Sequence, residues 1–155
     1  MSAVKIGVIG LGQRGLQHLN SLCKIEDAEV VALCDPTAEN LVEDKIARYV
    51  DGFRMGNIKT YTDFSDFFSS SVVDAMYFSI PPSLHAGEVL RAAERGVHLF
   101  VEKPVSLFLD EALEMERAID RAGILSTVGF NQRHDSWHTG IREFLSDKRL
   151  VCLLY

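Results

Sequence analysis

Short, nearly continuous apolar segments alternate along the chain with longer segments in which apolar residues recur every three or four positions. The short segments are typical of strands that are buried on both faces, because few of their side chains are polar. The expected strands are Val4–Ile9, Glu29–Leu33, Ala75–Ile80, His98–Val101 and Leu125–Phe130.

The segments of helical period lie between these strands. Gly96 and Gly123 stand near the ends of two of them, where a residue in the left-handed conformation commonly stops a helix. Residues Asp51–Thr62 show no regular period, so we expect a surface loop there. The expected helices are Arg14–Ile25, Ala38–Tyr49, Ser83–Arg95 and Asp110–Arg121. Strand–helix alternation of this kind predicts an α/β fold with a doubly wound parallel sheet.

Composition narrows the class of protein. The chain has 155 residues, a formal net charge of −6 and 47% apolar residues, which suits one globular domain and excludes a disordered chain. An acidic chain without a run of Lys or Arg is a poor nucleic-acid binder. No apolar run is long enough for a membrane helix, and the first residues lack the pattern of a signal peptide. Three widely spaced cysteines, Cys23, Cys34 and Cys152, are expected to be reduced core residues of a cytoplasmic protein.

The first expected strand runs directly into the motif Gly10-Leu11-Gly12-Gln13-Arg14-Gly15. In a dinucleotide-binding (Rossmann) fold, the first glycine allows a tight turn and the second lets the backbone approach a pyrophosphate. The third allows close packing of the helix. The phosphates then lie at the positive end of that helix. The position of the motif between a strand and a helix predicts a dinucleotide site.

The second expected strand is followed by Asp35, 20 residues beyond Gly15. A carboxylate at this point accepts hydrogen bonds from both hydroxyls of the adenosine ribose and repels a 2′-phosphate. The next residues, 36–39, include no Arg or Lys that could hold such a phosphate. We therefore expect NAD as the cofactor in preference to NADP.

Three later segments add specificity: Ile80-Pro81-Pro82-Ser83-Leu84-His85, Val101-Glu102-Lys103-Pro104 and Gly129-Phe130-Asn131-Gln132-Arg133. With these motifs, nearly the whole chain resembles the N-terminal nucleotide-binding domain of the glucose–fructose oxidoreductase and inositol dehydrogenase family, often called Gfo/Idh/MocA. The resemblance implies an NAD(P)-dependent oxidoreductase that transfers a hydride between the nicotinamide and a sugar, cyclitol or related hydroxyl or carbonyl substrate. A non-catalytic nucleotide-binding sensor or regulator of the same family is the alternative.

The resemblance also implies roles for individual residues. Segment Pro81–His85 would border the cofactor, Glu102 and Lys103 would lie beside the nicotinamide ribose and the substrate, and Asn131 would line the site. Lys103 is the expected catalytic residue, because an ammonium can orient a hydroxyl and stabilise a developing alkoxide. The Lys103–Pro104 peptide is expected to be cis. The expected cofactor-binding residues are Gly10, Leu11, Gly12, Gln13, Arg14, Gly15, Asp35, Ile80, Pro81, His85, Glu102, Lys103 and Asn131.

A competing motif, His134-Asp135-Ser136-Trp137-His138, has the two-histidine spacing of zinc proteases. Asp is shorter than the usual Glu, and no third histidine follows, so we expect no metal site.

Members of the family are typically more than twice as long. We therefore expect residues 1–149 to form the nucleotide-binding domain and residues 150–155 to begin a strand that leads to a substrate domain absent from this chain. The apolar end of the chain, Val151–Tyr155, is expected to promote self-association, and a homo-oligomer is expected.

Overall fold

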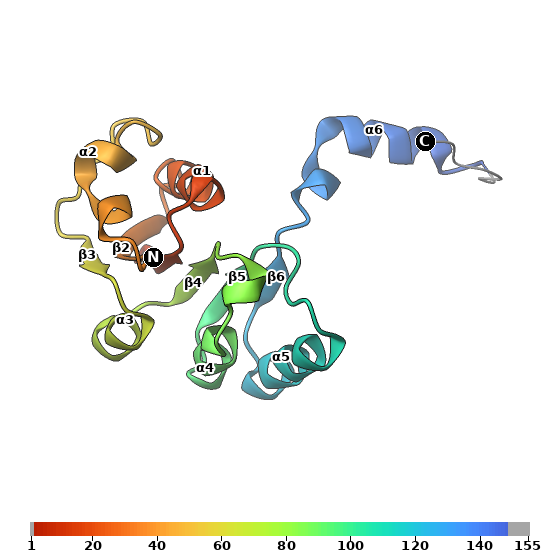
Figure 1. Ribbon diagram of the computed structural model, residues 1–155. Coiled ribbons are helices and arrows are strands. Elements are labelled where there is room, and N and C mark those ends of the chain that lie inside the picture. Colours follow the sequence, from red (N-terminus) through yellow and green to blue (C-terminus); the bar gives the residue numbers. More distant parts are fainter. Residues whose placement is uncertain (1, 149–155) are drawn as a thin grey trace.

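The computed structural model describes residues 2–148. Six strands form one sheet in the order β3-β2-β1-β4-β5-β6, and every pair of neighbours is parallel (Figure 1). The strands are β1 Val4–Ile9, β2 Ala28–Cys34, β3 Lys59–Tyr61, β4 Ala75–Phe78, β5 His98–Val101 and β6 Ser126–Val128. The predicted parallel α/β sheet is confirmed.

Helices lie on both faces of the sheet (Figure 1). Helices α1 Gln13–Leu22 and α2 Glu43–Ile46 cover one face, and α3 Phe64–Ser70, α4 Glu88–Glu94 and α5 Leu109–Ala122 cover the other. The predicted glycine ends are confirmed, since Gly96 and Gly123 follow α4 and α5 with φ of 77° and 62°. The doubly wound arrangement places the carboxyl ends of all six strands at one edge.

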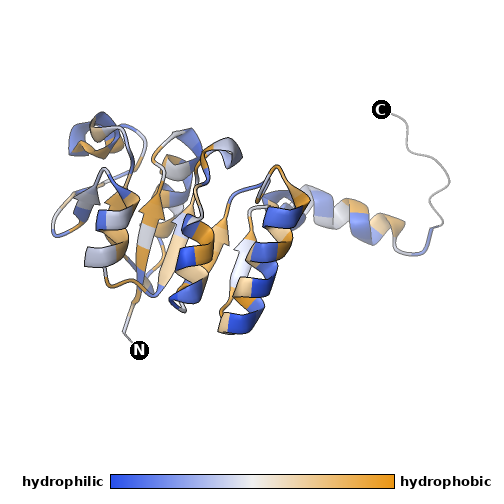
Figure 2. Ribbon diagram, turned by 60° about the horizontal axis from the view of Figure 1, so that its bottom comes forward, coloured by the Kyte–Doolittle hydropathy of each residue, from blue (hydrophilic) through white to orange (hydrophobic). Residues whose placement is uncertain are grey.

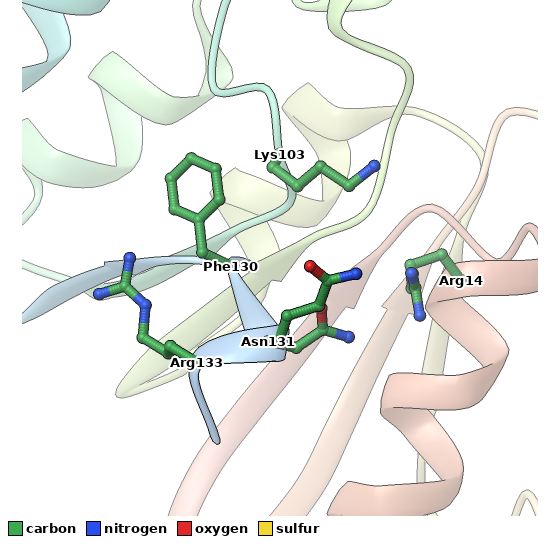
Figure 3. A pocket seen from close by; sticks show the side chains of 7 residues that line it. Arg14, Lys103, Phe130, Asn131 and Arg133 are labelled. Carbon is green, nitrogen blue, oxygen red and sulfur yellow. The ribbon is translucent and has the colours of Figure 1, made fainter. Parts of the chain in front are cut away.

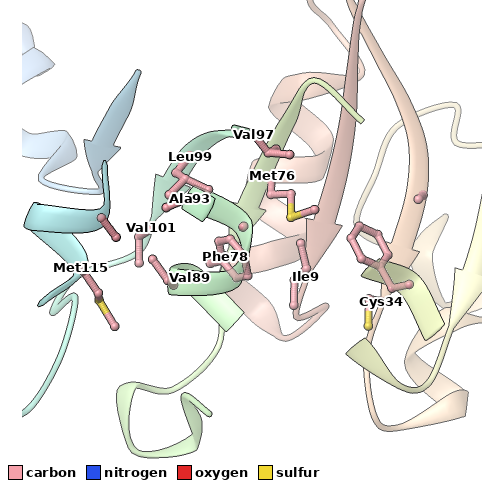
Figure 4. Packing of buried hydrophobic residues seen from close by; sticks show 14 residues of the cluster. Ile9, Cys34, Met76, Phe78, Val89, Ala93, Val97, Leu99, Val101 and Met115 are labelled. Atoms are coloured by element: carbon pink, nitrogen blue, oxygen red, sulfur yellow. The ribbon is translucent and has the colours of Figure 1, made fainter. Parts of the chain in front are cut away.

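Each face has its own hydrophobic core. Figure 4 shows the core under α3, α4 and α5, where Met76 and Phe78 of β4 pack with Val89 and Ala93 of α4. On the opposite face, Leu19 of α1 is packed with Val8 and Leu33 of the sheet and Ile46 of α2, all fully buried. Burial of such side chains contributes about 1.5–3 kcal/mol each, so the two cores fix the sheet between its helices.

Several sequence expectations are wrong in detail. Residues Asp51–Thr62 are not all loop, because β3 lies within them at the edge of the sheet. The expected helix Ala38–Tyr49 is a 3₁₀ turn followed by the four-residue α2, because Val42 has an extended conformation. The expected helix Ser83–Arg95 begins only at Glu88, because Gly87 before it is left-handed with φ 83°. Helix α3 was not predicted, although Asp63 caps it by accepting from the N–H groups of Ser65 and Asp66.

Burial also differs from the expectation in places. Cys34 is buried as predicted, but Cys23 is exposed because it stands at the end of α1. On the α1 side of the sheet, Phe100 of β5 is only half-buried and Thr127 of β6 is exposed. The prediction of strands buried on both faces is therefore wrong for these two strands.

Helix α6 Ser136–Leu145 was not predicted as a helix. It extends away from the sheet, and its apolar residues Trp137, Ile141 and Phe144 are exposed, Trp137 by 72% (Figure 2). The expectations for residues 150–155, a strand and self-association, lie outside the described residues. None of the described helices has the length and apolar character needed to cross a membrane.

Candidate active site

The glycine-rich turn lies at the carboxyl edge of the sheet, between β1 and α1. Here the strand order changes direction, because β2 lies on one side of β1 and β4 on the other. Open parallel sheets bind their ligands in the crevice at such a switch point. The turn is tied to both neighbours of β1: Gly10 N–H donates to the Cys34 carbonyl, and Ser79 N–H donates to the Ile9 carbonyl.

The three glycines of the motif meet different surroundings. Gly10 has φ 86°, and a Cβ there would lie 2.5 Å from the Ser79 carbonyl oxygen. A Cβ on Gly15 would lie 1.8 Å from the Gly10 carbonyl oxygen, so α1 packs directly on the turn. Gly12 has no heavy atom within 4 Å of a Cβ, and it begins α1 without a side-chain cap. Two glycines are therefore required by packing, and the third leaves open space at the positive end of the helix.

Asp35 lies directly after β2, and its residue is only 5% exposed. Its Oδ2 accepts a hydrogen bond from Leu11 N–H at 2.7 Å, which ties the glycine-rich turn to the end of β2. Its Oδ1 accepts from the N–H of Thr37 and from the side-chain amide of Asn40, both at 2.9 Å. All three donors are neutral groups, and together they fix the position of the carboxylate.

Glu102 lies directly after β5 and is held by cationic and aromatic neighbours. Its Oε1 lies 2.7 Å from Nε2 of His18 and 3.5 Å from Nε of Arg14, both on α1. Its Oε2 accepts from the N–H of Lys103 at 3.1 Å. A Cβ on Gly129 would lie 3.0 Å from this carboxylate, so glycine leaves the room it occupies. Helix α1 and the ends of β5 and β6 are thereby joined around one side chain.

A cleft of about 500 Å³ opens beside Glu102 at the ends of β5 and β6. Figure 3 shows the side chains of Lys103, Asn131 and Arg14 around it. Its lining is Arg14, Lys103, Gly129, Phe130, Asn131, Gln132 and Arg133. This lining carries three cations and no carboxylate, so the cleft favours an anionic or polar ligand. The Lys103–Pro104 peptide beside it is cis, as predicted.

A second hollow, of about 440 Å³, lies at the ends of β1, β2 and β3. Its lining is Ile9, Cys34, Pro36, Thr62, Asp63, Phe64, Ser65, Ile80, Leu84, Ala86, Glu88 and Arg91. Burial, with smaller contributions from the charges of Asp35 and Asp63, raises the pKa of the Cys34 thiol to about 12. Cys34 is therefore protonated, and the hollow offers a largely apolar wall for a flat ring.

The side chain of His85 is only 6% exposed, and it lines neither hollow. Its Nδ1 lies 3.3 Å from Oε1 of Glu88, and the N–H of Ala86 donates to Oε2 of Glu88 at 2.5 Å. Burial acts to raise the pKa of the Glu88 carboxyl, but the imidazole and the backbone N–H donors outweigh it and hold the pKa below its usual value. The geometry makes His85 a partner of Glu88, which lines the second hollow.

Four of the thirteen expected site residues line the two hollows. Arg14, Lys103 and Asn131 line the first, and Ile80 lines the second. The sequence analysis missed His18. A single histidine on the buried face of a helix cannot be distinguished from a core residue by its position in the sequence. Across residues 2–148, no three His, Cys, Asp or Glu side chains gather in a way that could hold a metal ion.

Comparison with known proteins agrees with this geometry. Residues 4–130 match the GFO_IDH_MocA family, described as an oxidoreductase family with an NAD-binding Rossmann fold. The chain is 33% identical over 129 residues to an uncharacterized oxidoreductase, YrbE, of Bacillus subtilis, covering 83% of this chain and 36% of that protein. It is also 33% identical over 132 residues to myo-inositol 2-dehydrogenase of Thermotoga maritima, covering 85% and 37%. A third relative, 32% identical over 124 residues, is a glycosyl hydrolase family 109 protein of Shewanella putrefaciens, covering 78% and 27%.

Solved structures show the same fold. A probable dehydrogenase from Thermotoga maritima superposes with a TM-score of 0.79 at 28% identity, over 93% of this chain and 41% of that one. Scyllo-inositol dehydrogenase from Lactobacillus casei, with bound NAD(H) and scyllo-inositol, superposes with a TM-score of 0.80 at 24% identity, over 94% and 41%. The chain thus spans between a quarter and two fifths of the length of these relatives. The chain belongs to the Gfo/Idh/MocA oxidoreductase family, and residues 4–130 correspond to its NAD-binding Rossmann fold.

Proposed function

We propose that the carboxyl edge of the sheet holds NAD across the glycine-rich turn, with the adenosine over the second hollow and the nicotinamide in the Lys103 cleft. The open space at Gly12, at the uncapped start of α1, suits the pyrophosphate. The apolar wall formed by Ile9, Ile80 and Leu84 suits the adenine ring. Of the expected residues, Pro81 and His85 would act by shaping the segment next to Ile80.

We propose further that the protein transfers a hydride to or from a sugar, cyclitol or related polyol. NAD would supply the hydride acceptor, and its reduced form the donor. Lys103 would donate a hydrogen bond to the reacting substrate oxygen and stabilise its negative charge, while Asn131 would orient a neighbouring hydroxyl. Glu102, held by His18, would fix the start of the Lys103 segment. The observation that carries this proposal is the cationic cleft at the end of β5, which joins Lys103 to the helix of the glycine-rich turn.

The cofactor part of the proposal is tested by calorimetric titration of the chain with the four nicotinamide dinucleotides. We expect NAD(H) to bind with micromolar affinity and more tightly than NADP(H). The double variant Asp35→Ser, Pro36→Arg should narrow or reverse this preference, because it removes a repelling carboxylate and adds a partner for phosphate. Tighter binding of NADP(H) by the unchanged chain would contradict the NAD assignment.

The catalytic part needs an assay of nicotinamide reduction in the presence of inositols and sugars. The names of the relatives state both dehydrogenase and glycosyl hydrolase activities, so aryl glycosides belong in the same panel. Lys103→Ala should abolish turnover and leave most of the NAD affinity. Because a substrate domain is expected to be absent from this chain, which alone could be inactive, turnover is assayed with a protein that includes that domain. NAD binding by that protein without turnover of any substrate in the panel would favour the sensor alternative. The proposal retains the expected cytoplasmic setting and homo-oligomeric assembly, and light scattering tests the latter.

A further inference from the structure

The preference between NAD and NADP depends on the surroundings of Asp35. A carboxylate has about four acceptor positions. Three of those on Asp35 are taken by the N–H groups of Leu11 and Thr37 and by the amide of Asn40. One position remains, on Oδ2. Asp35 can therefore accept from one ribose hydroxyl while these bonds persist, and its contribution to selectivity comes mainly from its charge.

A cation is held close to that charge by the side chain of Asn40. Asn40 donates through Nδ2 to Oδ1 of Asp35 at 2.9 Å, and its own Oδ1 accepts from Nζ of Lys45 at 2.6 Å. The ammonium thus lies two hydrogen bonds from the carboxylate. Both Asn40 and Lys45 are half-buried, so this lysine is not a freely moving surface side chain.

The local fold explains why a lysine ten residues away reaches this place. Asn40 belongs to the 3₁₀ turn Ala38–Leu41, and Lys45 to α2, which begins after the extended residue Val42. The chain therefore folds back toward Asp35. Residues 36–39, which directly follow Asp35 in the sequence, contain neither Arg nor Lys, so the cation at this place comes from further along the chain.

We propose that Asn40 and Lys45 determine cofactor specificity at the adenosine ribose, with Lys45 acting as a partner for a 2′-phosphate and opposing the repulsion by Asp35. Asn40 is the positioning residue, because it acts through the two charges it joins. A neutral residue at position 35 would remove the repulsion and leave Lys45 free to donate to the phosphate. The inference rests on the proposed binding of NAD at this edge of the sheet.

The test is a double-mutant cycle. The unchanged chain, the single variants Asp35→Ser and Lys45→Gln, and the double variant are each titrated with NADH and NADPH. We expect Asp35→Ser to raise the NADPH-to-NADH affinity ratio by about tenfold or more, and Lys45→Gln to lower it by about threefold to tenfold. The gain from Asp35→Ser should be at least about threefold smaller when position 45 is Gln. Lys45→Arg should keep the original ratio, because it keeps the charge. These differences should shrink as ionic strength rises, since they depend on charge.

Lys5→Gln is the matched control. It makes the same change of charge near the amino end of β1, on the side of the sheet opposite the carboxyl ends of the strands. It should leave the affinities for NADH and NADPH unaltered. An equal gain from Asp35→Ser with Lys or Gln at position 45 would overturn the inference and leave the proposed function intact. If circular dichroism shows that Asp35→Ser does not fold, the test is the NADPH-to-NADH affinity ratio of Lys45→Gln compared with that of Lys45→Arg. Equal ratios in these two variants would reject the role of Lys45. Binding of neither dinucleotide by the unchanged chain would overturn the proposed function itself.

Discussion

Two carboxylates occupy equivalent places at the edge of the sheet, and they differ in what surrounds them. Asp35 directly follows β2, and Glu102 directly follows β5. Neutral N–H donors make all three hydrogen bonds to Asp35. Glu102 instead faces the guanidinium of Arg14 and the imidazole of His18. The hydrogen bonds to Asp35 therefore come from neutral groups, and the ammonium of Lys45 reaches it only through Asn40, whereas Glu102 has a guanidinium 3.5 Å away.

This difference indicates how the carboxyl edge of the sheet can treat an anionic group differently at its two ends. We expect the charge of Asp35 to disfavour a phosphate beside it, opposed in part by Lys45, whereas the cations Arg14, Lys103 and Arg133 that line the cleft favour an anion. The two ends are joined by α1, which carries Arg14 and His18 and begins at the turn whose Leu11 N–H is bound to Asp35. The following changes separate the contributions of the two ends.

The largest effect is expected at the turn that supports Asp35. Gly15→Ala places a Cβ against the Gly10 carbonyl oxygen, so the turn and the Leu11–Asp35 bond must shift. We expect the free energy of unfolding in urea to fall by about 3 kcal/mol, with loss of NADH binding. Gly12→Ala is the control, because its Cβ meets open space. Its stability should stay within about 0.5 kcal/mol, while its NADH affinity falls. Equal stability losses in the two variants would contradict the packing argument.

The two carboxylates can be compared directly by removing their charges. In Asp35→Asn, an amide NH₂ faces N–H donors in a buried place, and we expect a loss of about 2–3 kcal/mol in the free energy of unfolding. In Glu102→Gln, the amide oxygen still accepts from His18 or Lys103, so the loss should be about 1 kcal/mol. Urea titration followed by circular dichroism measures both. A larger loss for Glu102→Gln would reverse the comparison.

The tie between α1 and Glu102 is tested at His18, whose ring lies 4.7 Å from that of Phe100 and 5.9 Å from that of Tyr77. His18→Phe keeps an aromatic ring there and removes the partner of Glu102. We expect a stability loss of about 1 kcal/mol and weaker NADH binding. His18→Gln retains an N–H donor and should restore part of the affinity. Unchanged binding in His18→Phe would show that Glu102 does not need this partner.

The smallest effect concerns a third carboxylate, Glu88, which lines the second hollow and is paired with His85. Its pKa is lower in the folded protein than its usual value of 4.5, so it stabilises the fold above that pH, and this contribution is lost as the pH falls through the folded pKa. Glu88→Gln should therefore lower stability near neutral pH and make little difference in acid. Thermal unfolding at several pH values tests this. A stability difference that does not decrease as the pH falls below 4.5 would contradict the assignment.

The sequence predicted the parts of the fold in which strong local signals agree. A continuous apolar segment, three glycines and a helical period in residues 4–25 define β1, the turn and α1 without any distant contact. By contrast, β3 has only three residues and is defined by pairing with β2, which no local pattern reveals. Gly87 interrupts a good helical period, and its conformation decides where α4 begins.

The site was predictable only as separate segments. Asp35 was singled out by its place after the second strand, whereas Glu102, Lys103 and Asn131 were singled out by the resemblance to the family. Their partners His18 and Lys45 come from helices that fold back over the strand ends. The contact of His18 with Glu102 spans 84 residues of sequence. Such contacts depend on the packing of the helices, which the pattern of apolar residues leaves undetermined.

The position of the single tryptophan determines what tryptophan fluorescence can report. Trp137 lies on α6, exposed to solvent, and no other tryptophan exists in the chain. Its emission maximum should already be near that of free indole in the folded protein, so unfolding of the two cores will scarcely change it. The same property makes Trp137 a selective reporter of any surface that comes to cover α6. A blue shift on adding a partner or raising the protein concentration would report contact at this helix, independently of events at the cofactor site.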